Sequence, residues 1–203
     1  MTITDLAVLC ADADDQTAAV RWYGGTSGGE ESGADWETLA QAVARHLQAR
    51  RPVALGLTCP LFTALGHEPA SLKAAGEGAD GWWGTGEMAA AAFAAGLSNV
   101  VWVLRRIRTL VRAPAFLKWA DFAHARNGLF VWEAAMTELP RKGGAIDTRA
   151  AVASFRDALP DPTQRNVLSV EEAYSLIGSA LLRTGWKSNP AVLSTPPLVI
   201  RIQ

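Results

Sequence analysis

The sequence predicts an α/β fold in which helices cover a mixed central β-sheet. Short apolar runs of strand length alternate with segments of helical length, which is the pattern of buried strands packed between helices. The first two runs follow each other closely and predict a hairpin, whereas helices alternate with the later runs, and together they predict a mixed sheet. The 203 residues fit one domain, spanning 1–203, and suffice to bury a sizeable core.

The first part of the chain predicts the hairpin and one amphipathic helix. Residues 6–11 are an apolar run typical of a buried strand, and residues 17–23 follow as a second strand rich in β-favouring side chains. Residues 24–33 contain mainly Gly, Ser and Glu and are expected to form a loop. A helix is expected over residues 35–50, because Asp35 is a good N-cap and apolar residues recur at helical spacing.

The middle of the chain combines two buried strands with a long helix. Residues 53–57 and 129–134 are short apolar runs that predict strands. A helix is expected over residues 87–111, and the arginines in its last turns suit the negative end of a helix dipole. A shorter helix is expected over residues 116–126. Residues 61–86 lack a regular pattern, and long loops of this kind are often functional.

The C-terminal part predicts two further helices and a last strand. Residues 147–159 have the pattern of a helix. Ser169 is expected to cap a helix that runs to residue 183, because Ser-Val-Glu-Glu matches a capping box. Residues 198–202 are expected to form a short strand. Together these elements predict a three-layer arrangement, with the sheet between helices.

The charge balance and the first residues limit the expected partners and location. The formal net charge of −1 gives no support for broad, sequence-blind binding to nucleic acid, although a local basic patch is compatible with it. The chain opens without a secretory signal and has two cysteines, Cys10 and Cys59, so we expect a cytoplasmic protein without a disulfide. The longest apolar stretch, residues 88–104, is mostly alanine and predicts a buried helix rather than a membrane span.

Three acidic residues form the candidate catalytic and metal-binding site. Asp12 follows the first strand, Glu133 stands at the end of the 129–134 strand, and Glu172 lies in the first turn of the expected late helix. If the two strands are neighbours, their acids converge at one edge of the sheet, where carboxylates need a cation to offset their repulsion. Mg²⁺ or Mn²⁺ is the hard ion for such ligands, and a pair of these ions can activate water for phosphoryl transfer.

Each acid also has an ordinary structural interpretation, which the sequence leaves open. Asp12 can serve a turn, and Glu133 can pair with an arginine. Glu172 and the neighbouring Glu171 can simply complement a helix N-terminus.

Several short segments resemble a bacterial family, domain of unknown function 429. Residues 53–62, VALGLTCPLF, resemble its strand-to-loop segment, and the Gly76-Glu77 step with the following tryptophan resembles its central loop. Residues 129–134 resemble its second acidic strand, and residues 170–180 resemble its late helix. The resemblance implies a ribonuclease H-like fold and an expected nuclease activity. Carried over by position, it places the acids at Asp12, Glu133 and Glu172.

The chain departs from that family at two points. Thr58 stands where the family usually has an acid, and alanine at Ala74 or Ala75 replaces an arginine common before the Gly-Glu step. Both changes weaken a site for an anionic substrate, and two of the three acids are glutamates, which place a metal differently from aspartates. These departures indicate a divergent or inactive relative of that family.

Other sequence features give weaker functional hypotheses. Residues 26–29, Thr-Ser-Gly-Gly, lack the Gly-Lys-Ser/Thr ending of a phosphate-binding loop. Cys59 and His67 are a candidate nucleophile and base, set against an inert thiol. The pair Trp82-Trp83 can stack on a base or fill the core. The arginines at the end of the long helix contact phosphate or are simply solvated: Arg105, Arg106, Arg108 and Arg112.

Two functions are therefore carried forward. The first is a Mg²⁺- or Mn²⁺-dependent nuclease or phosphodiesterase, with nucleic acid or a phosphorylated small molecule as substrate and Asp12, Glu133 and Glu172 as ligands. The second is a non-catalytic domain that keeps the fold and binds a small ligand or a protein partner. The loss of an acid at Thr58 favours the second, and the three acids at the expected points favour the first.

Overall fold

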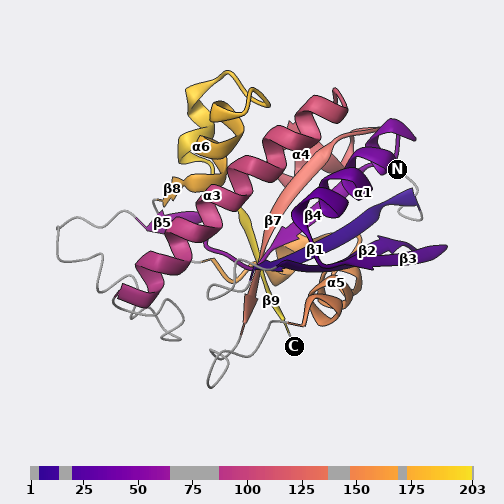
Figure 1. Ribbon diagram of the computed structural model, residues 1–203, viewed down its shortest axis with the longest axis horizontal. Coiled ribbons are helices and arrows are strands. Elements are labelled where there is room, and N and C mark those ends of the chain that lie inside the picture. Colours follow the sequence, from indigo (N-terminus) through magenta and orange to yellow (C-terminus); the bar gives the residue numbers. More distant parts are fainter. Residues whose placement is uncertain (1–4, 14–19, 65–86, 137–146, 169–172, 203) are drawn as a thin grey trace.

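The protein forms a mixed β-sheet between two layers of helices, which confirms the α/β class and the flanked mixed sheet (Figure 1). The structure is a computed structural model and describes residues 5–13, 20–64, 87–136, 147–168 and 173–202. The strands are β1 (Ala7–Ala13), β2 (Val20–Thr26), β3 (Gly29–Gly33), β4 (Val53–Leu57), β5 (Phe62–Ala64), β6 (Ala115–Phe116), β7 (Leu129–Met136), β8 (Ala173–Ser175) and β9 (Leu198–Ile202).

The helices are α1 (Trp36–Gln48), α3 (Glu87–Leu110), α4 (Trp119–Ala123), α5 (Thr148–Asp157) and α6 (Leu176–Arg183), with short 3-10 turns η2 (Pro162–Arg165) and η3 (Pro190–Ser194). Three of the helices have an N-cap residue whose side chain accepts a hydrogen bond from a backbone amide of the first turn. Asp35 accepts from the Thr38 amide at the start of α1, and Asp147 accepts from two amides at the start of α5. Ser175 accepts from the Gly178 amide at the start of α6.

The main sheet has the order β3-β2-β1-β4-β7-β6, and β9 also pairs with β7. β1, β2 and β3 are antiparallel neighbours, whereas β4 is parallel to β1 and β7 is parallel to β4. β6 and β9 pair with successive parts of β7 in the parallel sense. Because β1, β4 and β7 are parallel, their carboxyl ends meet at one edge of the sheet. This edge carries the candidate site.

Alternation along the strands divides the core between the two faces of the sheet. One face is covered by α1, α3 and α6, and its buried residues include Ala11, Leu57 and Val131 from the strands. The other face is covered by α4 and α5, and there Phe130 and Trp132 belong to a group of tightly packed aromatic rings. In that group the Trp132 and Phe155 centroids are 4.7 Å apart. Figure 1 shows α5 on the opposite side of the sheet from α1 and α3.

Three sequence expectations about the elements are wrong. Residues 24–33 are not a loop, because β2 continues to Thr26 and β3 begins at Gly29. The segment 116–126 is only partly helical: Phe116 ends a short strand beside β7, and α4 begins at Trp119. The late helix begins at Leu176 rather than after Ser169, because Ala173–Ser175 is a strand that pairs with β5.

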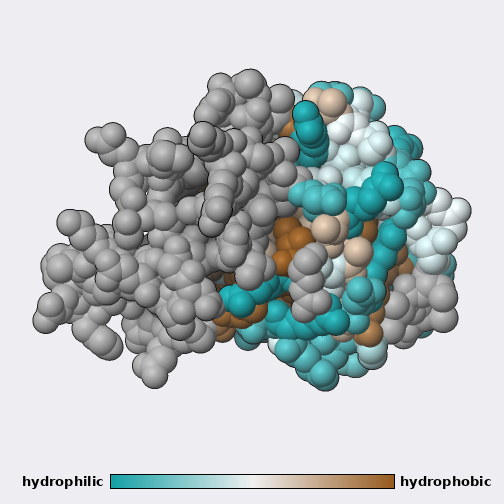
Figure 2. All heavy atoms as spheres, turned by 90° about the horizontal axis from the view of Figure 1, so that it is seen from below, coloured by the Kyte–Doolittle hydropathy of each residue, from teal (hydrophilic) through white to brown (hydrophobic). Residues whose placement is uncertain are grey.

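Polar residues cover most of the described surface on the side seen from below (Figure 2). Smaller hydrophobic areas come to the surface near the middle of this view. Among the described residues, no helix is both long enough and apolar enough to cross a membrane.

Candidate functional site

The carboxyl edge of the parallel strands brings two of the three predicted acids to nearly the same level. The strand register aligns Ala11 of β1 with Leu57 of β4, and Leu57 with Glu133 of β7. Asp12 is one residue further along β1, so it lies inside the strand rather than just past it. The two acids therefore lie at one edge of the sheet, as the sequence suggested, but their strands are not neighbours, because β4 lies between β1 and β7.

Asp12 forms a pair with Thr58, the residue directly after the neighbouring strand β4. The Thr58 amide donates to the Ala11 carbonyl, which extends the β1–β4 pairing one step past Leu57. This brings the side chain of Thr58 beside Asp12, and its hydroxyl donates to Asp12 Oδ1 at 2.6 Å. Asp12 is 7% exposed, so this hydrogen bond satisfies a nearly buried carboxylate. The pair is the direct structural consequence of having threonine at position 58.

Cys10 and Arg21 lie beside the same carboxylate. Cys10 precedes Asp12 by two residues and is completely buried on the same face of β1. Burial, and then the charge of Asp12, raise the pKa of the Cys10 thiol well above its ordinary value. Arg21 stands opposite Asp12 in the antiparallel register of β1 and β2. Asp12 thus lies among side chains of the protein itself.

Glu133 is completely buried and has a different environment. The Leu61 amide donates to Glu133 Oε2 at 2.9 Å, and Oε1 has no hydrogen-bond partner within the described part of the chain. Burial raises the pKa of Glu133 to about 8, while the Leu61 amide acts in the opposite direction. Among the described residues its partner is thus a backbone amide and not an arginine. At neutral pH the carboxyl group is mainly protonated, and its second oxygen is available to a further group.

Strand alternation directs Asp12 and Glu133 to opposite faces of the sheet. Cys10, two residues from Asp12, packs in the core under α5, whereas Ala11 packs under α1 and α3. On β7, Val131 packs under α1 and α3, and Glu133 follows it by two residues and shares its face. The two acids therefore reach the edge from different sides.

Glu172, the third predicted acid, lies outside the described residues, as do Glu171, His67 and the pair Trp82-Trp83. In the part of the chain that is described, no group of three His, Cys, Asp or Glu side chains is arranged to hold a metal ion. The described residues alone therefore do not fit a two-ion centre. The three-acid metal site stays a prediction, as does the Cys59–His67 pair.

A small hollow opens at the same edge, on the face covered by α1. Its empty volume is about 180 Å³, a figure that includes space open to solvent, so the hollow is a shallow surface feature. Its walls are Ala11, Ala13, Trp36, Leu57, Thr58 and Cys59. The indole nitrogen of Trp36 is buried and has no acceptor among the residues described. Sequence reasoning assigned Trp36 only to a helix face, and nothing in the sequence marks it as a wall of this hollow.

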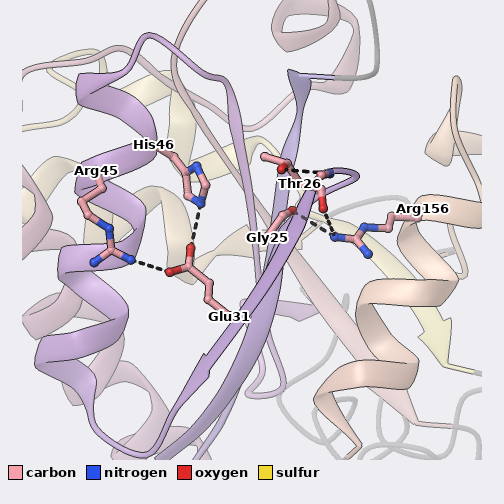
Figure 3. Close-up of polar contacts among 7 residues, drawn as sticks. Gly25, Thr26, Glu31, Arg45, His46 and Arg156 are labelled. Carbon is pink, nitrogen blue, oxygen red and sulfur yellow. Dashed lines mark hydrogen bonds and ion pairs between the residues drawn. The ribbon is translucent and has the colours of Figure 1, made fainter.

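Charged side chains hold the β2–β3 hairpin from both faces of the sheet (Figure 3). Glu31 accepts from Arg45, and the His46 Nε2–Glu31 Oε1 distance is 2.8 Å; both partners are on α1. On the other face, Arg156 of α5 donates to the Gly25 carbonyl at 3.0 Å. Arg156 also lies 3.6 Å from Glu30, the residue beside Glu31. Neighbouring glutamates on one strand thus connect to different helix layers, which fixes β2 beside β1.

Comparison with family models, with curated proteins and with solved structures finds no match to this chain. The resemblance to domain of unknown function 429, which stands on residues 53–62, 129–134 and 170–180, stays a prediction.

Proposed function

We propose that this chain is a divergent ribonuclease H-like domain that binds a ligand or partner without hydrolysing phosphodiesters. The strand order supports the ribonuclease H-like part of the proposal: a three-stranded antiparallel meander, β1–β3, is followed by β4 and β7, both parallel to β1. Glu133 at the carboxyl edge of β7 and Asp12 on β1 are the acids that the resemblance expects there.

One observation carries the non-hydrolytic part: the Thr58 hydroxyl donates to Asp12 at 2.6 Å. Position 58 is where the resemblance expects an acid, and two facing carboxylates at this separation require a cation to offset their repulsion. The Thr58 hydroxyl instead donates a hydrogen bond to Asp12, so no cation is needed to offset repulsion between two carboxylates. The arrangement is complete without a metal ion.

The test is hydrolysis of single- and double-stranded DNA and RNA in the presence of Mg²⁺ or Mn²⁺. The proposal expects no turnover above that of a purified Asp12→Asn variant, which controls for contaminating nucleases. Turnover that needs the metal and disappears in Asp12→Asn would overturn it.

A metal-dependent nuclease or phosphodiesterase is the second candidate, because Glu133 has a buried oxygen with no partner among the described residues. A buried carboxylate oxygen of this kind is a position where an ordered water or an ion can bind. In this alternative Asp12, Glu133 and Glu172 hold Mg²⁺ or Mn²⁺, and the substrate is nucleic acid or a phosphorylated small molecule. The native chain distinguishes the candidates, since only the second predicts metal-dependent turnover, and Glu133→Gln should then abolish it.

A further inference from the structure

An exposed tryptophan lies among arginines on the outer side of α3. Trp102 is 46% exposed, and Val167 is the other large apolar side chain that is exposed among the described residues. Arg105 and Thr109 follow it at helical spacing, are also exposed and lie on the same side of α3. Arg112, just past the helix, and Arg183, at the end of α6, are exposed as well. These residues are referred to as the α3–α6 basic face.

The two helices that carry this face are fixed against each other. The Trp186 indole, three residues past Arg183, donates to the Leu104 carbonyl of α3 at 2.9 Å. Arg108 covers the Trp186 ring, with its guanidinium carbon 5.3 Å from the ring centroid. Figure 1 shows α6 beside α3 along the same side of the molecule. The two helices that carry the exposed arginines are therefore packed into one unit.

The surface has an excess of positive charge although the whole chain is nearly neutral. The sequence has no Asp or Glu in residues 88–120 or in residues 173–203. Glu37 of α1 reaches this side, but its carboxylate is bonded to Arg106 at 2.7–3.1 Å. Within the described residues, no acid is ion-paired with Arg105, Arg112 or Arg183. These three cations are available to an external anion.

We propose that the α3–α6 basic face binds single-stranded nucleic acid. Guanidinium groups suit phosphate, because their planar donors match its oxygens. An exposed indole between such groups can stack on an unpaired base, which a duplex does not offer. An acidic peptide supplies the negative charge but no regularly placed planar group for Trp102, so the nucleic acid is favoured.

This inference does not rest on the proposed function, because the end of α3 lies at the edge of the sheet opposite to the acids. Gln48, at the end of α1, donates to the Leu110 carbonyl at the end of α3. The chain leaves α1 to enter the amino end of β4, and it leaves α3 to enter the amino end of β6. Asp12 and Glu133 lie at the opposite, carboxyl edge of the sheet. Binding of nucleic acid at the basic face is therefore independent of ligand binding or hydrolysis at the carboxyl edge.

The experiment is fluorescence anisotropy of a labelled oligothymidine with the full chain, over a series of salt concentrations without added divalent metal. We expect binding that weakens as salt rises. Trp102→Ala should weaken it roughly fivefold or more, the loss of one stacked base. The double variant Arg105→Gln, Arg112→Gln should reduce the slope of log K against log salt by about 1.4, which corresponds to two phosphate contacts.

Arg149→Gln is the matched control, since Arg149 is an exposed arginine on α5, on the opposite face of the sheet. It should leave the affinity within about twofold of the native chain. The proposal is overturned if oligothymidine does not bind at low salt, or if Arg149→Gln weakens binding as much as the α3 variants do. It is equally overturned if labelled polyglutamate binds more tightly than oligothymidine, because the face then serves an acidic protein. A circular dichroism spectrum of each variant establishes that it is folded.

Discussion

At the scale of single residues, the Asp12–Thr58 pair decides how the carboxyl edge is interpreted. Thr58→Val keeps the shape of the side chain and removes the hydroxyl that donates to Asp12. Because Asp12 is only 7% exposed, the loss leaves a nearly buried carboxylate oxygen without this donor. We expect the free energy of unfolding to fall by about 1–3 kcal/mol in urea denaturation. Thr58→Ser keeps the hydroxyl and should cost clearly less; equal losses would show that the hydrogen bond contributes little.

Thr58→Glu introduces the acid that the resemblance expects at this position, and it should create a need for a cation. Two carboxylates then face each other across β1 and β4, so the variant should unfold at a lower temperature than the native chain. Millimolar Mn²⁺ should restore part of that loss, because an ion that binds only the folded state stabilises it. Adding Asp12→Asn should abolish the Mn²⁺ effect. A Mn²⁺ response that persists in the double variant would mean that the ion binds elsewhere.

Glu133 should make stability depend on pH. Its pKa in the folded chain is about 8, against an ordinary value of 4.5. Between these values the unfolded chain has released this proton and the folded chain retains it, so the unfolded state binds fewer protons. The contribution of Glu133 to stability is thus complete below pH 4.5 and is lost as the pH rises towards 8.

Glu133→Gln, which cannot titrate, isolates that contribution. The stability difference between native chain and variant should change by up to about 1.4 kcal/mol per pH unit across this window, to the disadvantage of the native chain at high pH. Denaturant melts at several pH values measure it. A difference that stays constant from pH 4.5 to 8 would show that Glu133 is ionised in the folded protein.

At the scale of elements, the β2–β3 hairpin depends on contacts with both helix layers. Glu31 contacts α1 and Arg156 of α5 donates to the hairpin backbone, but Arg45 is 60% exposed and solvent weakens its ion pair. The double variant Glu31→Gln, Arg156→Gln should therefore loosen the hairpin locally more than it destabilises the whole chain. Hydrogen exchange should become faster at the amides of β2 and β3 and stay unchanged in β4 and β7. Uniformly faster exchange in all four strands would contradict a local role.

The sequence predicted the buried elements well and the partly exposed ones poorly. The strands near residues 53–57, 129–134 and 198–202 are confirmed, because continuous apolar runs have few alternatives to a buried strand. β3 was missed, since the sequence Gly-Glu-Glu-Ser-Gly has no apolar alternation and its pairing with β2 is a tertiary effect. β8 was missed for a similar reason: pairing with β5 decides its conformation, while the local pattern suggested a helix.

Some features of the candidate site could be predicted from the sequence and others could not. The positions of Asp12 and Glu133 at one edge follow from strands that could be recognised locally. Their opposite faces depend on the register, which places Leu57 level with both Ala11 and Glu133. The donor from Thr58 and the amide of Leu61 come from a neighbouring strand and its loop. Such contacts join residues remote in sequence, and no local pattern specifies them.

At the scale of the whole molecule, the two ends of the sheet have different chemistry. The carboxyl edge carries a hydrogen-bonded aspartate, a buried glutamate with a raised pKa and a small hollow. The outer side of α3 carries Trp102 and exposed arginines that pair with no acid among the described residues. We therefore propose that the chain has a nuclease-like fold but does not hydrolyse phosphodiesters. The central claim of this proposal is that the native carboxyl edge does not need a metal ion, because Thr58 donates to Asp12.

Thermal unfolding of the native chain with and without Mn²⁺ tests that claim most directly. The account predicts that millimolar Mn²⁺ leaves the midpoint unchanged, and that Asp12→Asn and Glu133→Gln are equally insensitive to the ion. A midpoint that rises with Mn²⁺ concentration in the native chain, and does so in neither variant, would contradict the claim and establish Asp12 and Glu133 as metal ligands.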